Sequence, residues 1–186
     1  MLRLFVAAEI PETQRAAVAA AAGSLRASLG DTLPGARWTG EGGWHVTLKF
    51  VGSVAEERLE TVSAAVAAVA AGSAGPAEVR LTGLGAFPTA RRARVLWVGL
   101  EEPDGVLAAA ASALEERFRA EGFPAEARPW RPHLTLARLR LPAPVELPAG
   151  GIGAEPFTVG ELVLFRSHLH PSGAVYEALG RFPLQR

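Results

Sequence analysis

The stretches GWHVTLKFVG (residues 43–52) and RPWRPHLTLAR (residues 128–138) decide the fold, because the two carry the same pattern. In each, a histidine is followed two residues later by a threonine, within a run of apolar and β-branched residues. Residues i and i+2 of a β-strand point to the same face of the sheet. Each stretch therefore predicts a strand that presents one imidazole and one hydroxyl side by side.

His45 with Thr47, and His133 with Thr135, form a set that suits acid–base chemistry on a phosphate. Histidine titrates near neutral pH, so one ring can accept a proton while the other gives one. The two hydroxyls can donate hydrogen bonds to phosphate oxygens. Either motif alone has a simpler interpretation, a core histidine beside a strand-forming threonine. The functional interpretation depends on the two occurring together.

The order of elements along the chain repeats around these motifs. Expected strands are 2–10, 37–39, 44–51, 78–87, 95–100, 134–139, 157–169 and 175–183, and expected helices are 11–29, 55–71 and 104–121. The two histidines lie 88 residues apart, close to half the chain, and a helix precedes each motif. We therefore expect an α+β fold with two pseudo-symmetric lobes, in which antiparallel sheets flank a central cleft and the helices lie outside. Residues 141–156, rich in proline and glycine, are expected to form an exposed loop.

Composition limits the class of protein. With 186 residues, 49% of them hydrophobic, the chain can bury a sizeable core, and we expect one bilobal domain over residues 1–186. The formal net charge is zero, so no global field draws the protein to nucleic acid or a membrane. There is no cysteine, which excludes disulfides and thiol nucleophiles, and no HExxH spacing, so we expect no metal. We expect a cytoplasmic monomer with no membrane association and no cofactor.

Arg131 lies two residues before His133 and would share its face if the strand extended that far. Pro132 between them favours an extended conformation at Arg131. The guanidinium could then fork onto the phosphate, and the alternative is a surface arginine in a loop. Arg138 has the opposite parity to His133, which predicts a structural role or a contact at the rim of the cleft.

Four further side chains are possible contacts for a ligand. Arg91 and Arg92, with Arg94, follow Phe87-Pro88 and could steer a phosphate backbone, although a solvated loop explains them equally well. Trp130 could stack on a terminal base. His168 and His170 have same-face spacing, but they lack a third ligand nearby, so we interpret them as a turn within a closing hairpin around Pro171-Ser172-Gly173.

The two motifs resemble those of the 2H phosphoesterase superfamily, whose name refers to two His-x-Thr/Ser-x motifs. More narrowly, the chain looks like the bacterial and archaeal RNA 2′,3′-cyclic phosphodiesterases, long labelled 2′–5′ RNA ligases. The similar segments run the length of the chain: LRLFVAAEIP (2–11), WHVTLKFVG (44–52), GAFPTARRARVLWVG (85–99), RPWRPHLTLAR (128–138) and FRSHLHPSGAVYEALGRFPL (165–184).

The resemblance implies a two-lobed α+β fold that hydrolyses a terminal 2′,3′-cyclic phosphate to a 2′-phosphate without a metal. The substrates would be RNA ends or nucleotides that carry this group. The residues that match the family motifs are His45, Thr47, His133 and Thr135. Our hypothesis is that His45 is the acid that protonates the leaving O3′ and that His133 is the base for water.

Two other functions remain open. The reverse reaction would join RNA ends through a 2′–5′ bond, using the same two histidines. A nucleotide-binding module without chemistry would be expected to lack a motif residue, and both motifs are complete. The chain has no P-loop and no G-x-G-x-x-G after a strand, so an ATP-driven ligase has no support.

Overall fold

The structure is a computed structural model that describes residues 1–30, 33, 35–170 and 173–185. Its strands are β1 (Leu2–Glu9), β2 (Arg37–Trp38), β3 (His45–Val54), β4 (Ala77–Phe87), β5 (Ala93–Glu101), β6 (His133–Ala143), β7 (Phe157–Val159), β8 (Glu161–His170) and β9 (Gly173–Pro183). Its helices are α1 (Glu12–Leu29), α2 (Leu59–Ala71) and α3 (Val106–Ala120), with short 3₁₀ turns η2 (Glu41–Gly43), η3 (Glu56–Arg58) and η4 (Ala90–Arg92).

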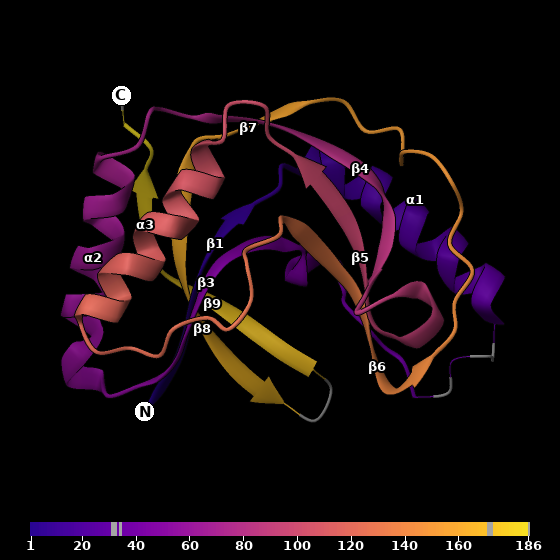
Figure 1. Cartoon of the computed structure of the whole chain (residues 1–186), viewed down its shortest axis with the longest axis horizontal. Coiled ribbons are helices and arrows are strands. Elements are labelled where there is room, and N and C mark those ends of the chain that lie inside the picture. The colour runs from indigo at the N-terminus through magenta and orange to yellow at the C-terminus, as the bar shows by residue number, and fades with distance from the viewer. Residues whose placement is uncertain (31–32, 34, 171–172, 186) are drawn as a thin grey trace.

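The strands form one curled antiparallel sheet in the order β7-β4-β5-β6-β3-β1-β8-β9, with β2 also paired to β6 (Figure 1). The two strands that carry the histidine motifs, β3 and β6, are neighbours in the middle of this order. Each is followed outward by three more strands, so the sheet divides into two similar halves. The predicted α+β fold with two related halves is confirmed, and the halves are joined into a continuous sheet.

The junction between the halves is narrow. Within the described residues β3 and β6 share one register pair, Val46 opposite Leu134. By contrast, β1 and β3 share eight pairs, and β5 and β6 share six. We call the pair Val46–Leu134 the seam, and it lies between the histidine and the threonine of each motif.

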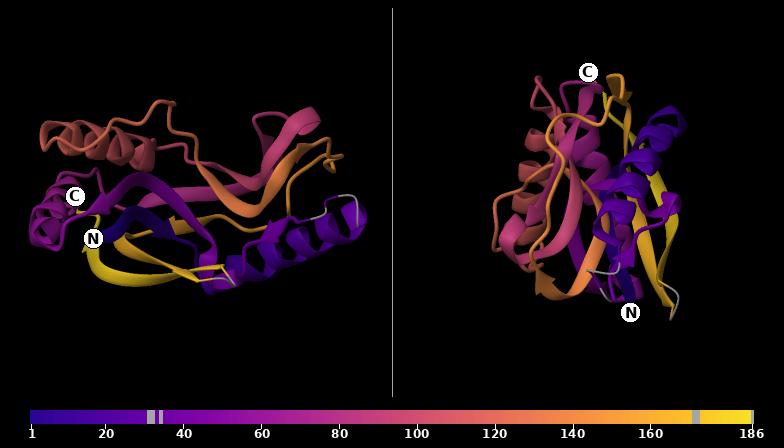
Figure 2. Two further views of the ribbon diagram at one scale, coloured as in Figure 1. Left: turned by 90° about the horizontal axis from the view of Figure 1, so that it is seen from below. Right: turned by 90° about the vertical axis from the view of Figure 1, so that its right-hand side faces the viewer.

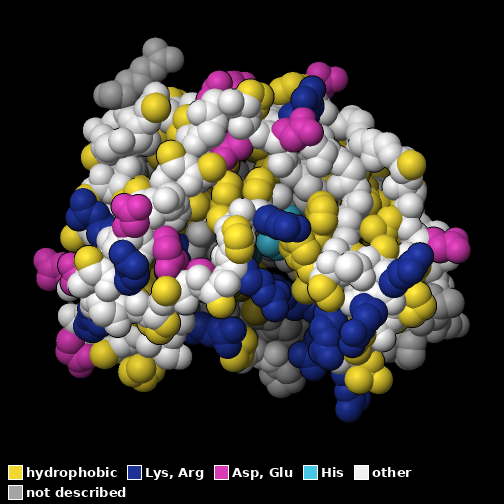
Figure 3. All heavy atoms as spheres, viewed as in Figure 1, with side chains coloured by type: hydrophobic (Ala, Val, Ile, Leu, Met, Phe, Trp, Pro, Cys, Tyr) yellow, Lys and Arg dark blue, Asp and Glu magenta, His cyan; other side chains and the backbone are white. Residues whose placement is uncertain are grey.

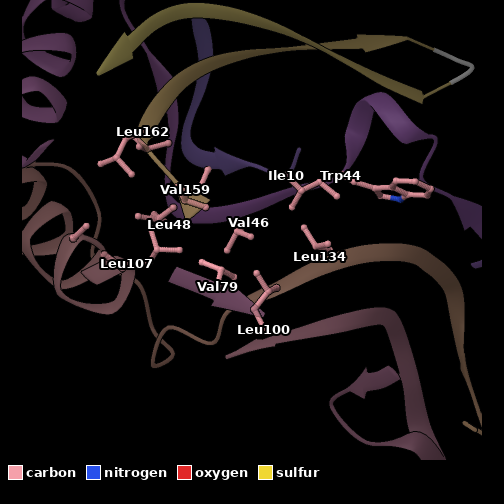
Figure 4. Packing of buried hydrophobic residues seen from close by; sticks show 14 of the residues in the cluster. Ile10, Trp44, Val46, Leu48, Val79, Leu100, Leu107, Leu134, Val159 and Leu162 are labelled. Carbon is pink, nitrogen blue, oxygen red and sulfur yellow. The ribbon is translucent and has the colours of Figure 1, made fainter. Parts of the chain in front are cut away.

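The helices lie outside the sheet, as expected. Figures 1 and 2 place α1 at one end of the molecule and α2 with α3 at the other. The buried face of the central strands packs beneath the seam, where Val46, Leu48 and Leu134 lie among apolar side chains such as Leu100 and Leu107 (Figure 4). Burial of each such side chain stabilises the fold by roughly 1.5–3 kcal/mol. The opposite face of β3 and β6 is left for the histidines and threonines.

Each central strand carries a β-bulge just after its motif. The register between β1 and β3 shifts so that Leu48 is the extra residue, and the register between β5 and β6 shifts in the same way at Leu136. Two buried residues then follow one another in each strand, and the alternation of faces resumes out of phase. The fifth residue after each histidine, Phe50 or Arg138, is therefore returned to the face of the motif.

Three local predictions need correction. The single strand predicted over 157–169 is two strands separated by Gly160: β7 pairs with β4, whereas β8 pairs with β1 and β9. The predicted loop 141–156 begins as strand, since β6 runs to Ala143. The predicted turn at His168 and His170 is wrong, because both residues belong to β8, whose pairing with β9 stabilises an extended backbone. The hairpin is confirmed for the part that forms β8 and β9, and residues 171 and 172 lie outside the described residues. None of the helices described is long and apolar enough to cross a membrane.

Candidate functional site

A groove of about 1060 Å³ opens over the central strands, between the β4–β5 connection and helix α3. Figure 3 shows the hollow with a histidine side chain in it and basic side chains beside it. The lining residues come from both halves of the sheet, from α3 and from the segment that precedes β6: Thr47, Leu48, Phe50, Phe87, Pro88, Val95, Ser112, Glu115, Glu116, Arg119, Ala125, Glu126, Arg128, Pro129, Trp130, Arg131, His133 and Arg138.

The four predicted motif residues lie on the groove side of β3 and β6. Thr47 and His133 line the groove directly. His45 and Thr135 are half-buried on the same strand faces, alternating with the fully buried residues of the seam. The two imidazoles are close enough that the charge of His133 affects the protonation of His45. The structure thus brings together both motifs.

His45 lies in an aromatic box. Its ring stacks on Phe5 at 4.8 Å between centroids, meets Tyr176 edge-on at 5.0 Å, and lies 6.0 Å from Phe165. These rings come from β1, β9 and β8, so three neighbouring strands enclose one imidazole. Burial, followed by the positive charge of Arg138, lowers the pKa of His45 from 6.5 to about 4. His45 is therefore neutral near pH 7.

His133 has a more polar setting. Its Nδ1 lies 2.8 Å from the carbonyl oxygen of Arg131, a geometry in which the ring N–H donates to the carbonyl. Phe87 meets the ring edge-on at 5.0 Å, and Trp97 lies 6.4 Å away. Burial lowers the pKa of His133, while the bond to the carbonyl opposes that change. The carbonyl also fixes the ring so that Nε2 is the nitrogen left for a substrate.

Three side chains at the groove, Thr47, Thr135 and Arg138, can bind an anion. Among the described residues, no protein group accepts a hydrogen bond from the hydroxyl of Thr47 or Thr135, and no carboxylate pairs with Arg138. Arg138 is exposed, lines the groove and lowers the pKa of both histidines. The parity count, which predicted a structural role or a contact at the rim for Arg138, gives the wrong strand face, because the bulge at Leu136 reverses the alternation. The run Leu136-Ala137, two apolar residues in succession before Arg138, was the signal in the sequence.

Phe50 holds the equivalent place in the first half, and sequence reasoning also missed it. Its side chain lines the groove and is 52% exposed, a large apolar ring left in contact with solvent. Phe87 and Pro88 line the groove as well, from the end of β4. The groove thus offers apolar surface on the same side as the motif residues, which is suited to the flat face of a nucleobase.

Arg131 and Trp130 both line the groove, although β6 begins only at His133. Arg131 is exposed and contributes its carbonyl to His133, as described above. Trp130 donates its indole N–H to the carbonyl oxygen of Thr47 at 2.8 Å. One hydrogen bond therefore connects the segment before the second motif to the backbone of the first.

An ion pair between a buried lysine and a half-buried glutamate holds the same segment. Lys49, 2% exposed, lies 2.8 Å from a carboxylate oxygen of Glu115 on α3 and donates to the carbonyl oxygen of Pro124 at 3.0 Å. The other oxygen of Glu115 accepts the backbone N–H of Glu126 at 3.0 Å. The hydrogen bond from Lys49 lowers the pKa of Glu115. We call Lys49, Glu115 and their backbone partners the clamp, and no pattern in the sequence indicated it.

The remaining candidates are placed less centrally. Arg91 and Arg92 are exposed in η4 and do not line the groove. Trp44, which precedes His45 in the chain, is 4% exposed and belongs to the core. His168 pairs across strands with Glu177, Nε2 to Oε2 at 2.8 Å. Across the described ranges, no three His, Cys, Asp or Glu side chains are grouped as a metal site would require.

Comparison with known proteins identifies the family. The family model described as the 2′-5′ RNA ligase superfamily matches residues 11–171. A relative named RNA 2′,3′-cyclic phosphodiesterase from Thermus thermophilus is 35% identical over 99% of this chain and 91% of its own. A relative of the same name from Geobacillus stearothermophilus is 32% identical over 97% of this chain, and the chain spans 56% of that relative's length.

The fold is shared with solved structures. A crystal structure of a protein from Thermus thermophilus matches with a TM-score of 0.83 at 31% identity, over 98% of both chains. The match of the family model and the identity to the relatives extend over most of the sequence, with both His-x-Thr motifs inside the matched range. The chain belongs to the 2′–5′ RNA ligase superfamily.

Proposed function

We propose that this protein hydrolyses 2′,3′-cyclic phosphate at the end of RNA to a 2′-phosphate. The observation that carries the proposal is the pairing of two His-x-Thr strands at the seam, with both imidazoles on the groove side. The relatives from Thermus and Geobacillus are named for this activity, which supports the same substrate. Opening the ring requires a base for water, an acid for O3′ and donors for the charged oxygens.

His45 is the better candidate for the base. A general base must start neutral, and the aromatic box around His45 excludes water and disfavours its charged form. Our hypothesis from sequence alone assigned the base role to His133. The surroundings of the two rings support the opposite order.

His133 then acts as the acid. Its pKa is lowered by less than that of His45, so the first proton taken up by the pair resides mainly on His133. The bond from Nδ1 to the carbonyl of Arg131 also stabilises the protonated ring. In that state Nε2–H is directed to the leaving O3′, while neutral His45 accepts a proton from water on the opposite side of the phosphorus. A bound phosphate raises both pKa values because its negative charge favours the imidazolium forms.

The phosphate oxygens are held by Thr47 and Thr135, whose hydroxyls have no protein acceptor among the described residues, and by Arg138. Arg131, which the sequence predicted as a phosphate ligand, reaches the same groove from the segment before β6. A removed donor of this kind typically costs about 10²–10³-fold in kcat. All of these groups belong to the protein itself, so we expect turnover in the presence of a chelator.

The test is hydrolysis of a short RNA ending in 2′,3′-cyclic phosphate, with EDTA present. Wild type, His45→Ala and His133→Ala are compared, and chromatography resolves the 2′-phosphate from the 3′-phosphate. We expect wild type to produce the 2′-phosphate and both variants to lose turnover. Tight binding of the same RNA without any turnover by wild type would instead indicate a binding module.

Ligation through a 2′–5′ bond is the second candidate, because the matched family is named for it. The same two histidines would act in reverse, and water at high concentration favours hydrolysis over joining. The same assay detects it if a strand with a 5′-hydroxyl is added in excess. We further propose that residues 1–186 work as one bilobal unit, as a monomer in the cytoplasm where RNA ends arise.

A further inference from the structure

Next to the groove, where β2 pairs with β6, two like charges face each other. Arg37 of β2 lies directly opposite Arg138 of β6 in antiparallel register. Residues opposite each other in such a pair have Cα atoms only about 4.5–5.5 Å apart. Like charges in this position destabilise a sheet. Among the described residues neither arginine pairs with a carboxylate, so nothing in that part of the protein offsets the repulsion.

The row of arginines continues beyond this pair. Arg140 is exposed on the same face of β6 as Arg138, with buried Leu139 between them. Two residues along a strand correspond to about 7 Å. Turn η4 lies beside the outer end of β6, since the N–H of Val145 donates to the carbonyl of Ala90 at 2.8 Å. That contact brings the exposed Arg91 and Arg92 next to the row, and Figure 3 shows basic side chains gathered beside and below the hollow.

The opposite side of the groove is different in charge. Helix α3 and the segment before β6 line it with Arg119 and Arg128, but also with Glu115, Glu116 and Glu126. Glu115 is already paired with Lys49, so Glu116 and Glu126 are the carboxylates that offset the charges of Arg119 and Arg128 and leave this side without an excess of positive charge. The two sides therefore differ in their suitability for a polyanion, although both border the same groove.

We propose that the RNA strand upstream of the terminal nucleotide runs over an arginine track formed by Arg37, Arg138, Arg140 and η4. This inference rests on the proposed function, because Arg138 links the track to the site of the cyclic phosphate. The terminal base lies in the apolar part of the groove beside Phe50 and Phe87, and the preceding phosphates follow the track outward. Stacking at one end and cations along the backbone is a common arrangement for single-stranded nucleic acid. The preferred substrate is accordingly an oligonucleotide and not a cyclic mononucleotide.

The test compares two substrates, adenosine 2′,3′-cyclic phosphate and a hexanucleotide with the same terminal group. The test variant is the double substitution Arg37→Gln with Arg140→Gln, which leaves Arg138 in place. The matched control is Arg117→Gln, an exposed arginine on α3 that does not line the groove. A second double variant, Arg119→Gln with Arg128→Gln, examines the opposite side. Thermal unfolding of each variant verifies the fold.

We expect kcat/KM for the hexanucleotide to exceed that for the mononucleotide and to fall about tenfold in Arg37→Gln/Arg140→Gln. Each lost phosphate contact lowers the slope of log affinity against log salt by about 0.7 for a single strand, so the variant should lose about 1.4. Turnover of the mononucleotide and the behaviour of the control should not change. Equal losses on both substrates, no preference for length in wild type, or a loss confined to the Arg119/Arg128 variant would each overturn the proposal.

A binding measurement separates this proposal from the proposed function. Fluorescence anisotropy with a labelled hexanucleotide that ends in a 2′-phosphate does not depend on turnover. If wild type hydrolyses neither substrate, yet binding weakens in Arg37→Gln/Arg140→Gln and not in the control, the track stands and the proposed reaction fails. If binding is unaffected by that variant, the track is wrong whatever the activity.

Discussion

Strands β3 and β6 present the same backbone with different chemistry. Both carry His-x-Thr, both have a bulge after it, and both return the fifth residue to the groove. In β3 that residue is Phe50, and aromatic rings enclose the histidine. In β6 it is Arg138, and a carbonyl holds the histidine. The difference teaches that one repeated backbone device can give two imidazoles unequal proton affinities.

The strongest test of the unequal proton affinities of His45 and His133 removes each imidazole ring in turn. We expect His45→Ala and His133→Ala each to lower kcat/KM by roughly 10²–10⁴-fold, the range for one proton transfer. When the 3′-oxygen of the substrate is replaced by sulfur, the sulfur can leave as a thiolate and needs no proton from an acid. It should therefore restore turnover in His133→Ala and not in His45→Ala. Rescue of His45→Ala instead would return the acid role to His45.

Arg138→Gln should produce the next largest effect, a loss of about 10²-fold in kcat/KM, because one cationic donor to the phosphate is removed. The same change should shift the acid limb of the pH–rate profile to higher pH, because the charge of Arg138 lowers the pKa of both histidines and its removal raises them. Phe50→Leu is the matched variant at the equivalent position. It should raise KM for substrates with a purine base and leave the pH profile in place.

Within the described residues, the clamp is a stabilising ion pair that the first motif strand makes and the second does not. Lys49 is buried with Glu115 as its carboxylate partner, whereas the equivalent position in β6 is Ala137. Glu115→Gln should lower the free energy of unfolding by about 1–3 kcal/mol, as expected when a buried group loses its partner. Lys49→Met removes the buried charge itself and should cost less. Urea denaturation measures both, and a larger loss for Lys49→Met would contradict this account.

The smallest expected effect is the dependence of the free energy of unfolding on pH. The pKa of His45 is about 4 in the folded chain and 6.5 without the fold, so between these values the unfolded chain binds a proton that the folded chain does not. Stability is therefore lost as pH falls through this window, and His133 contributes in the same direction. We expect wild type to lose about 1–2 kcal/mol between about pH 7 and pH 5. His45→Asn should show a shallower dependence in parallel urea titrations.

The helices, most of the strands and the four motif residues could be predicted, because alternation and helical periodicity are local properties of the sequence. The division of 157–169 into β7 and β8 could not, because it depends on which strands each part pairs with. The strand face on which Arg138 lies could not be predicted. A bulge depends on the register against the neighbouring strand, so counting residues along β6 alone gives the wrong face. The clamp was also hidden, since Lys49 and Glu115 are separated by most of one half of the chain. The positions of His168 and His170 depended on pairing with β9, which a nearby proline obscured.

Because β3 and β6 share only the pair Val46–Leu134 within the described residues, a relative rotation of the two halves would pivot about the seam. Such a rotation displaces each atom in proportion to its distance from Val46 and Leu134. All four motif residues are chain neighbours of these two, so the imidazoles and hydroxyls move least. Phe87, at the end of β4, lies farther from the seam and would be displaced more, whereas α3 is tied to β3 by the clamp. A rotation of this kind would therefore change the outer wall of the groove more than the geometry of the four motif residues.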